Sequence, residues 1–226
     1  MNQNNMVRKL LNRLGWDVCH YRPFLEVLSE HAFDLVIDVG ANEGQFIKEL
    51  ERSGYKGDTI SYEPCQMPYR VLVDSRRNRL KNTMVNKALG NEIGKKVIRV
   101  YSDTRFSSFN KLRAVDLVYS EEEIDITTLN SEFESKYDFF SKYKKKCLKV
   151  DTQGFERDVL EGGSEVLGGI DAVIMECSYS RIYDRQWLIE DTVSYLRKRG
   201  FVLWGVKRGF IKGSREYECD CLFLKI

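Results

Sequence analysis

The chain has few of the residues that mark special environments. Its 226 residues include only three prolines and two histidines, and its net charge at neutral pH is +2. No apolar run approaches the ~18–20 residues that span a bilayer, and no apolar stretch near the start suits a signal peptide. A nearly balanced charge also gives no overall field that would attract nucleic acid. These absences argue against a transmembrane segment, a histidine-based metal site and a nucleic-acid partner.

The cysteines follow neither a disulfide framework nor a metal-binding spacing. Cys219-x-Cys221 is not the C-x-x-C of zinc and redox sites, and the others are scattered: Cys19, Cys65, Cys147 and Cys177. We therefore expect buried free thiols in a reducing compartment, a cytoplasmic location and no bound metal.

The chain does contain a regular alternation of secondary structure. From residue 33 onward, apolar strand-like runs alternate with helix-like segments, which predicts an α/β fold with a mostly parallel sheet and helices on both faces. The expected elements include strands at 83–89 and 124–129 and helices at 69–80, 131–146 and 155–167. The last two strands, 201–207 and 219–226, are joined without a helix and should form a C-terminal antiparallel hairpin. We expect one domain over 31–226 after an N-terminal helical extension over 1–30.

Apolar and basic residues alternate at helical spacing within this extension, at Val7, Leu10, Leu11 and Leu14 and at Arg8, Lys9 and Arg13. Such a helix can cap the domain core, which we favour, or make weak contact with a membrane surface through residues 7–14.

The segment that follows the first strand has the pattern of a nucleotide-binding turn. An acidic residue, a turn of small residues and a helix present backbone N–H groups and one carboxylate to a ligand. A dinucleotide site would need glycines where Asn42 and Gln45 stand, Glu43 would repel a pyrophosphate, and no P-loop Gly-Lys-Ser/Thr follows. The turn instead suits a cationic amino-acid ligand such as S-adenosylmethionine, with binding residues Asp38, Gly40, Asn42 and Gly44. A strand–helix turn in which the Asp only caps the helix is the alternative.

The end of the second strand supplies a further ligand contact. Glu63, in Tyr62-Glu63-Pro64, follows Asp38 by about 25 residues. A carboxylate at this place can accept hydrogen bonds from both ribose hydroxyls, at ~1.5–3 kcal/mol each. Because Glu63 also fits NAD, an NAD-linked oxidoreductase stays an alternative.

A later strand carries charges where a central parallel strand is normally apolar. Lys149 and Asp151 share one face at period two, and Glu176 ends the next strand. Buried charges must pair or reach a wet crevice, so we expect these side chains at the carboxyl edge of the sheet, beside Asp38 and Glu63. Structural pairing of Lys149 with Asp151 or Glu176 is the alternative to a catalytic role.

Several motifs, taken in order, resemble the FkbM-type family of S-adenosylmethionine-dependent methyltransferases. They are the loop at Asp38, Tyr62-Glu63-Pro64, Asn86-Lys87-Ala88-Leu89-Gly90, Ser107-Ser108, Leu148-Lys149-Val150-Asp151-Thr152-Gln153-Gly154-Phe155-Glu156 and Ile174-Met175-Glu176. The resemblance runs from about Phe33 to Phe201. It implies a Rossmann-like class I methyltransferase fold, S-adenosylmethionine as cofactor with contacts that include Pro64 and Ala88, and methyl transfer to a hydroxyl of a sugar or other small-molecule acceptor.

Such a transfer requires alignment of acceptor and methyl group, and a neutral hydroxyl also requires a base. We assign the base role to Asp151, acceptor orientation to Glu176 and Glu156, and control of their charge to Lys149. A magnesium-like ion between Asp151 and Glu176 stays an alternative that we do not adopt. Residues 103–146 and 178–186 are the expected acceptor region, with aromatic residues that could stack on a sugar ring: Phe106, Tyr119, Tyr179 and Tyr183.

Two other function classes compete with this prediction. Methyltransferases that act on exocyclic amines of nucleic acids resemble one another in an Asp/Asn-Pro-Pro-aromatic motif, whereas this chain has no proline near residue 151. Its basic groups at 76–79 and 142–146 fall at expected helix C-termini, where positive charge is favourable in any protein. A non-catalytic nucleotide-binding module is the other alternative, and the oligomeric state is not predicted.

Overall fold

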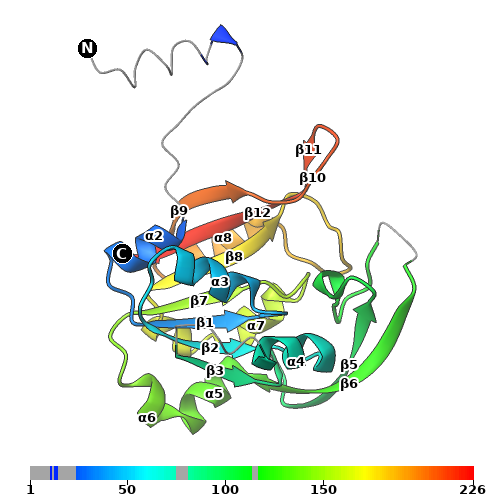
Figure 1. Ribbon diagram of the computed structural model, residues 1–226. Helices are drawn as coiled ribbons and strands as arrows, with labels where there is room; N and C mark the ends of the chain where they lie inside the picture. Colours follow the sequence, from blue (N-terminus) through cyan, green and yellow to red (C-terminus); the bar gives the residue numbers. More distant parts are fainter. Residues whose placement is uncertain (1–10, 12, 15–23, 75–80, 114–116) are drawn as a thin grey trace.

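The computed structural model describes residues 11, 13–14, 24–74, 81–113 and 117–226 (Figure 1). Most of the predicted extension, including residues 7–10, therefore lies outside the described residues, and its later part forms helix α2 (Phe24–Glu30). Within the described ranges, no helix combines the length and the apolarity that a membrane crossing requires.

A seven-stranded sheet forms the centre of the described structure. The first five strands in its spatial order are parallel, and β12 lies antiparallel between β8 and β9. This arrangement confirms the predicted α/β, Rossmann-like fold with a C-terminal antiparallel hairpin. The order is β3 (Asn82–Val85), β2 (Asp58–Tyr62), β1 (Leu35–Val39), β7 (Lys146–Val150), β8 (Ala172–Ser178), β12 (Glu218–Lys225) and β9 (Phe201–Arg208).

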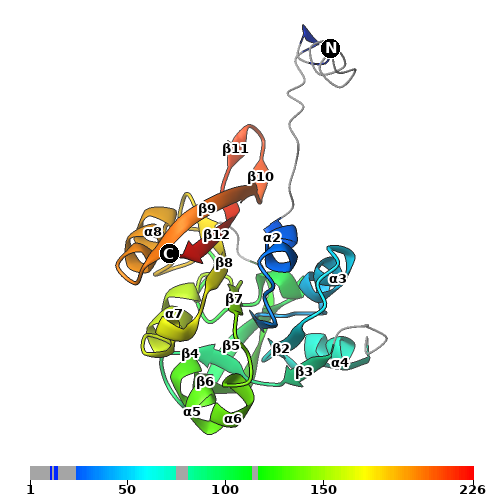
Figure 2. The same cartoon turned by 90° about the vertical axis from the view of Figure 1, so that its left-hand side faces the viewer.

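Helices cover both faces of this sheet, because alternate residues of each buried strand point to opposite sides (Figures 1 and 2). On one face, α2 and α3 (Gln45–Arg52) pack against Val36, Ile174 and Leu222. On the other, α7 (Glu156–Gly162) and α8 (Ile189–Arg197) pack against Leu148 and Val173. Five of the six cysteines are described, and all five are buried free thiols.

A second sheet was not predicted. It consists of β4 (Ala88–Gly90), β6 (Tyr119–Thr128) and β5 (Gly94–Tyr101). The predicted single strand 83–89 is wrong, because the Asn86 side chain donates hydrogen bonds to the carbonyls of Glu63 and Pro64 and the chain leaves the central sheet there. The predicted short strand 124–129 is instead the long β6, whose acidic residues face basic residues of β5, as in the Lys95–Glu123 ion pair at 2.8 Å.

Other predicted elements are shorter than expected or begin elsewhere. The predicted helix 69–80 begins earlier, as α4 (Gln66–Asp74). The helix expected over 131–146 divides into α5 (Leu129–Ser135) and α6 (Tyr137–Phe140), and that over 155–167 divides into α7 and the 3-10 turn η2 (Val166–Gly169). A 3-10 turn η1 (Thr104–Phe106) follows β5, and a small hairpin of β10 (Ile211–Lys212) and β11 (Arg215–Glu216) extends from β9.

Candidate active site

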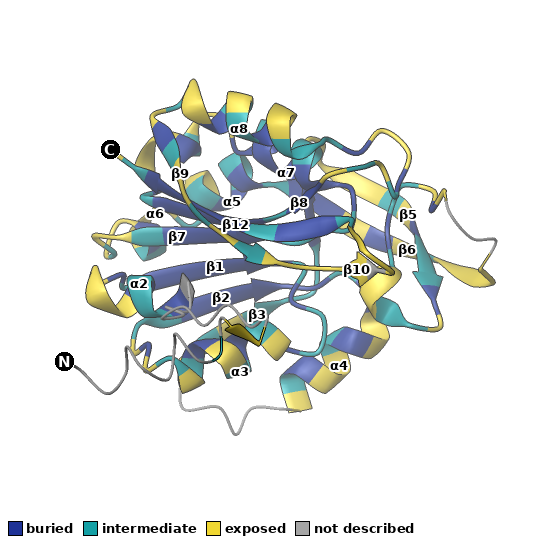
Figure 3. Cartoon of the chain, turned by 90° about the horizontal axis from the view of Figure 1, so that it is seen from above, coloured by how far each residue is buried: buried dark blue, intermediate teal, exposed yellow. Residues whose placement is uncertain are grey.

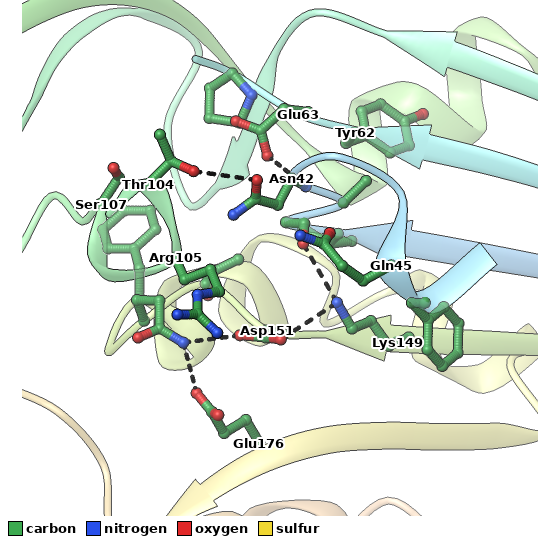
Figure 4. A pocket seen from close by; sticks show the side chains of 18 of the residues that line it. Asn42, Gln45, Tyr62, Glu63, Thr104, Arg105, Ser107, Lys149, Asp151 and Glu176 are labelled. Carbon is green, nitrogen blue, oxygen red and sulfur yellow. Dashed lines mark hydrogen bonds and ion pairs between the residues drawn. The ribbon is translucent and has the colours of Figure 1, made fainter. Parts of the chain in front are cut away.

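A cavity of about 710 Å³ opens at the carboxyl ends of the central strands (Figure 4). Its walls come from the loops after β1, β2 and β7, from the ends of β8 and β12, and from η1. This is the edge at which open α/β sheets bind ligands, and the volume lies within the ~300–1,000 Å³ usual for small-molecule sites.

The loop after β1 is held in a tight left-handed turn. Gly40 has φ +79°, and a Cβ at this residue would lie 1.9 Å from the carbonyl oxygen of Asp151, so only glycine fits between the two loops. Asn42 is also left-handed, with φ 46°. Gly40 and Asn42 line the cavity, whereas Gly44, the N-cap residue of α3 with φ 81°, does not.

Glu63 joins this turn to the end of β2. Its two carboxylate oxygens accept hydrogen bonds from the backbone N–H groups of Asn42 (2.8 Å) and Cys65 (2.9 Å). Burial raises the pKa of Glu63 to about 7, although these hydrogen bonds act in the opposite direction. Glu63, Pro64 and Ala88 line the cavity together, so the structure brings these three predicted contacts to one wall.

Lys149 is the buried cation of the site. Its Nζ lies 3.1 Å from Asp38 Oδ1 and 3.5 Å from Asp151 Oδ2, and it donates to the carbonyl of Gly40 at 3.3 Å. Burial lowers the pKa of Lys149, but the charges of Asp38 and Asp151 outweigh it and the pKa is raised. The ammonium therefore stays charged and fixes the two loops relative to each other.

Asp38 is placed differently from the sequence-based expectation. It is fully buried (0 % exposed) and is not among the residues that line the cavity, so it reaches the site through Lys149. Asp38 and Lys149 stand opposite each other in the β1–β7 pairing. The sequence could not show this partner, because the two residues meet only once the strand order is known.

Asp151 and Glu176 are joined by a side chain that the prediction did not include. Gln153 Nε2 donates to Asp151 Oδ1 at 3.0 Å and to Glu176 Oε2 at 2.8 Å, and Gln153 Oε1 accepts from the Tyr183 hydroxyl at 2.9 Å. Burial and the charge of Asp151 raise the pKa of Glu176 well above its usual value. Figure 4 shows Asp151 between Lys149 and Glu176, and all three line the cavity. Gln153 stands within the motif at 148–156, but an uncharged amide is no anomaly on a strand end and does not mark a site residue by itself.

Glu156 stabilises the loop after β7 and does not line the cavity. Its Oε1 accepts from the backbone N–H groups of Thr152 and Gly154, both at 3.0 Å. The side chain is buried and does not line the cavity, which gives no support to its predicted contact with the acceptor. Burial raises the pKa of Glu156 to about 7. Its hydrogen bonds fix the backbone that carries Asp151.

The far end of the cavity carries carboxyl groups that the prediction missed. Glu218 and Asp220 on β12 line it beside Glu176, which pairs with Asp220 across the strands. Burial and the charge of Glu156 raise the pKa of Glu218 to about 7. Of the four aromatic residues expected here, only Phe106 lines the cavity, and Tyr183 is fully buried beneath it. Placing β12 beside β8 requires the tertiary fold, so no local signal marked these residues.

Comparison with known proteins identifies the chain's family. The protein-family model described as the methyltransferase FkbM domain matches residues 38–203 of the sequence. The chain belongs to the FkbM family of methyltransferases. S-adenosylmethionine is accordingly its cofactor. A comparison with curated proteins gave no match.

Solved structures of other methyltransferases are similar to this FkbM methyltransferase at low identity. Magnesium protoporphyrin IX methyltransferase from Synechocystis PCC 6803 is 11% identical, with a TM-score of 0.49 and coverage of 100% of this chain and 98% of that one. A putative tRNA (m1A22) methyltransferase from Streptococcus pneumoniae is 12% identical, with a TM-score of 0.49 and coverage of 89% and 71%. The 1,6-didemethyltoxoflavin-N1-methyltransferase from Burkholderia thailandensis is 10% identical, with a TM-score of 0.49 and coverage of 90% and 77%.

The residues of the cavity fit this cofactor. Asp38 lies behind the cavity wall, where the Lys149 ammonium balances its buried charge at 3.1 Å, so the groups on this side that would meet a ligand are Gly40, Asn42 and Lys149. We propose that Glu63 accepts hydrogen bonds from the ribose hydroxyls and that the apolar side chains beside Ala88 in the cavity contact adenine: Leu89, Ile98, Phe109 and Phe155.

We expect cofactor-product affinity to depend on the protonation of Glu63. Hydrogen bonds from both ribose hydroxyls favour the carboxylate, whereas a pKa of about 7 means that the carboxyl is protonated below that pH. The dissociation constant of S-adenosylhomocysteine, measured by calorimetry, should therefore rise as pH falls below 7 and stay level above about 8.

Glu63→Gln should weaken binding about 10- to 100-fold at pH 8 and remove most of the pH dependence. The exposed Glu123→Gln is the control and should keep the wild-type profile. If the dissociation constant of Glu63→Gln still rose with falling pH in parallel with that of the wild type, Glu63 would not be the titrating group.

Proposed function

We propose that this methyltransferase transfers the methyl group to a hydroxyl oxygen of a sugar or other small-molecule acceptor, with Asp151 as the base. The observation that carries the proposal is the Asp151 carboxylate on the cavity wall, held by Gln153 and Lys149. S-adenosylmethionine supplies an electrophilic methyl group. A neutral hydroxyl that attacks it must lose its proton, and a carboxylate within hydrogen-bond reach accepts that proton.

The side chains around Asp151 support this role through position and charge. Gln153 donates a hydrogen bond to one carboxylate oxygen, and the Lys149 ammonium lies 3.5 Å from the other. Glu176, whose pKa is raised well above normal, can hold a proton and donate it to a second oxygen of the acceptor. Asp151 and Glu176 would therefore face one substrate as a pair of carboxyl groups, an arrangement typical of acid–base sites.

The charge of the acceptor end favours small hydroxyl compounds over nucleic acid. It is lined by the carboxyl groups of Asp151, Glu176, Glu218 and Asp220, whereas Lys207 is 3.4 Å from Asp220 and Lys149 is shared between two aspartates. A phosphate group placed beside the Asp151 base would meet like charge. The proposal includes a cytoplasmic location, which the buried free cysteines support.

A labelled-methyl assay tests the function directly. We expect transfer from S-adenosylmethionine to members of a panel of sugars, glycosides and hydroxylated natural products, and no transfer to tRNA or ribosomal RNA. Alkali-stable label on an ether oxygen, located by mass spectrometry, is the expected product. Label on RNA, or on nitrogen atoms only, would contradict the proposal; cofactor binding without transfer to any acceptor would favour a non-catalytic module.

A further inference from the structure

The outer edge of the central sheet carries an unusual group of exposed apolar side chains. β9 is the last strand of the sheet, and the β10–β11 hairpin extends from it in both side views (Figures 1 and 2). Five large apolar residues within positions 203–211 are between 37% and 57% exposed: Leu203, Trp204, Val206, Phe210 and Ile211. Figure 3 shows the same region as largely exposed. Single exposed apolar residues are common, but such a concentration indicates a contact surface.

Basic residues accompany these apolar side chains. The segment 201–217 contains Lys207, Arg208, Lys212 and Arg215 but only one acidic residue, Glu216, whereas the whole chain has a net charge of only +2. Arg208 and Arg215 are exposed, and the Arg215 guanidinium lies 5.0 Å from the ring centre of Tyr217. The edge of the sheet is therefore both apolar and locally positive.

We propose that the β9 edge and the β10–β11 hairpin, residues 203–216, bind an anionic lipid surface. Apolar side chains that enter the headgroup region, flanked by exposed arginines such as Arg208 and Arg215 that contact lipid phosphates, are the combination that interfacial binding requires. A second copy of the chain fits less well, because pairing this edge with itself would bring its positive charges together. Nucleic acid also fits less well, since three of the five apolar residues are aliphatic and cannot stack on bases.

Membrane binding at this edge has a consequence for the active site. Phe210 and Lys207 belong both to the proposed surface and to the wall of the cavity. The cavity mouth would therefore lie close to the lipid headgroups when the hairpin is bound. Lipid binding at this edge requires no particular acceptor, and it is separate from the membrane contact predicted for residues 7–14, most of which lie outside the described residues.

Vesicle co-sedimentation of the full chain tests the proposal. We expect the protein to bind vesicles of phosphatidylcholine mixed with phosphatidylglycerol, and to bind pure phosphatidylcholine vesicles at least tenfold more weakly. Arg208→Glu/Arg215→Glu should lower the partition coefficient on the anionic vesicles by more than about 25-fold. Trp204→Ser/Ile211→Ser should lower it about tenfold or more. The matched control Met67→Ser/Arg70→Glu changes one exposed apolar and one exposed basic residue of α4 and should bind as wild type does.

S-adenosylhomocysteine binding by each variant shows that it is folded. Equal binding to neutral and anionic vesicles, no binding to either, or undiminished binding of the two β9–β11 variants would each overturn the proposal. Retention of tRNA by the wild-type edge, with no vesicle binding, would assign this surface to nucleic acid instead.

Discussion

Asp151→Asn should lower the rate of methyl transfer about 10²- to 10⁴-fold, which is the usual contribution of a positioned general base. The substitution keeps the size of the side chain and an oxygen that can accept from Gln153 Nε2, the donor that lies 3.0 Å from Asp151 Oδ1. It removes the ability to take a proton from the acceptor hydroxyl. The loss should therefore appear in kcat, measured with saturating S-adenosylmethionine and an acceptor found in the panel.

Cofactor binding separates this result from a structural effect. S-adenosylhomocysteine affinity of Asp151→Asn should stay within a few-fold of wild type, because the contacts expected from Glu63 and from the loop at Gly40 are unchanged. Asp125→Asn, on the exposed face of β6, is the matched control and should keep full activity. Unchanged turnover of Asp151→Asn with intact cofactor binding would remove Asp151 from the mechanism.

The parts of the fold that the sequence predicted are those with local signals. Alternation of apolar strands with helices predicted the central sheet and its helical covering, and the missing helix between 207 and 219 predicted the antiparallel end. The second sheet has no such signal. Its strands β4 and β6 are more than 25 residues apart in the chain, and the acidic face of β6 becomes intelligible only opposite the lysines and arginine of β5.

The same distinction applies to the site. Five residues at or near the carboxyl ends of strands are brought together at the sheet edge and line the cavity: Gly40, Asn42, Glu63, Asp151 and Glu176. Glu218 and Asp220 could not be found in this way, because β12 precedes no helix and its place beside β8 is a matter of tertiary packing. The role of Asp38 was likewise hidden, since its partner is more than 100 residues away in the chain.

The ion pair between Lys149 and Asp38 gives the largest expected effect on stability. Lys149→Met should lower the free energy of unfolding by about 3–5 kcal/mol, because it leaves the fully buried Asp38 without the cation that lies 3.1 Å away. Burial already raises the pKa of Asp38, and Lys149 is the main influence in the opposite direction. The side chain of Met fills much of the same volume, so the loss reports charge and not a cavity. Urea unfolding at pH 7 measures it.

Removing both charges should recover much of the lost stability. Asp38→Asn/Lys149→Met leaves no unpaired buried charge between β1 and β7, so the double variant should be more stable than Lys149→Met alone, in a double-mutant cycle. Lys95→Met breaks the exposed ion pair with Glu123 and should leave the unfolding curve nearly unchanged. If Lys149→Met and Lys95→Met shifted the urea midpoint equally, Lys149 would contribute no more than an exposed lysine does. A large loss of stability that depends on Asp38 would show that one buried ammonium holds the two cofactor-side loops together.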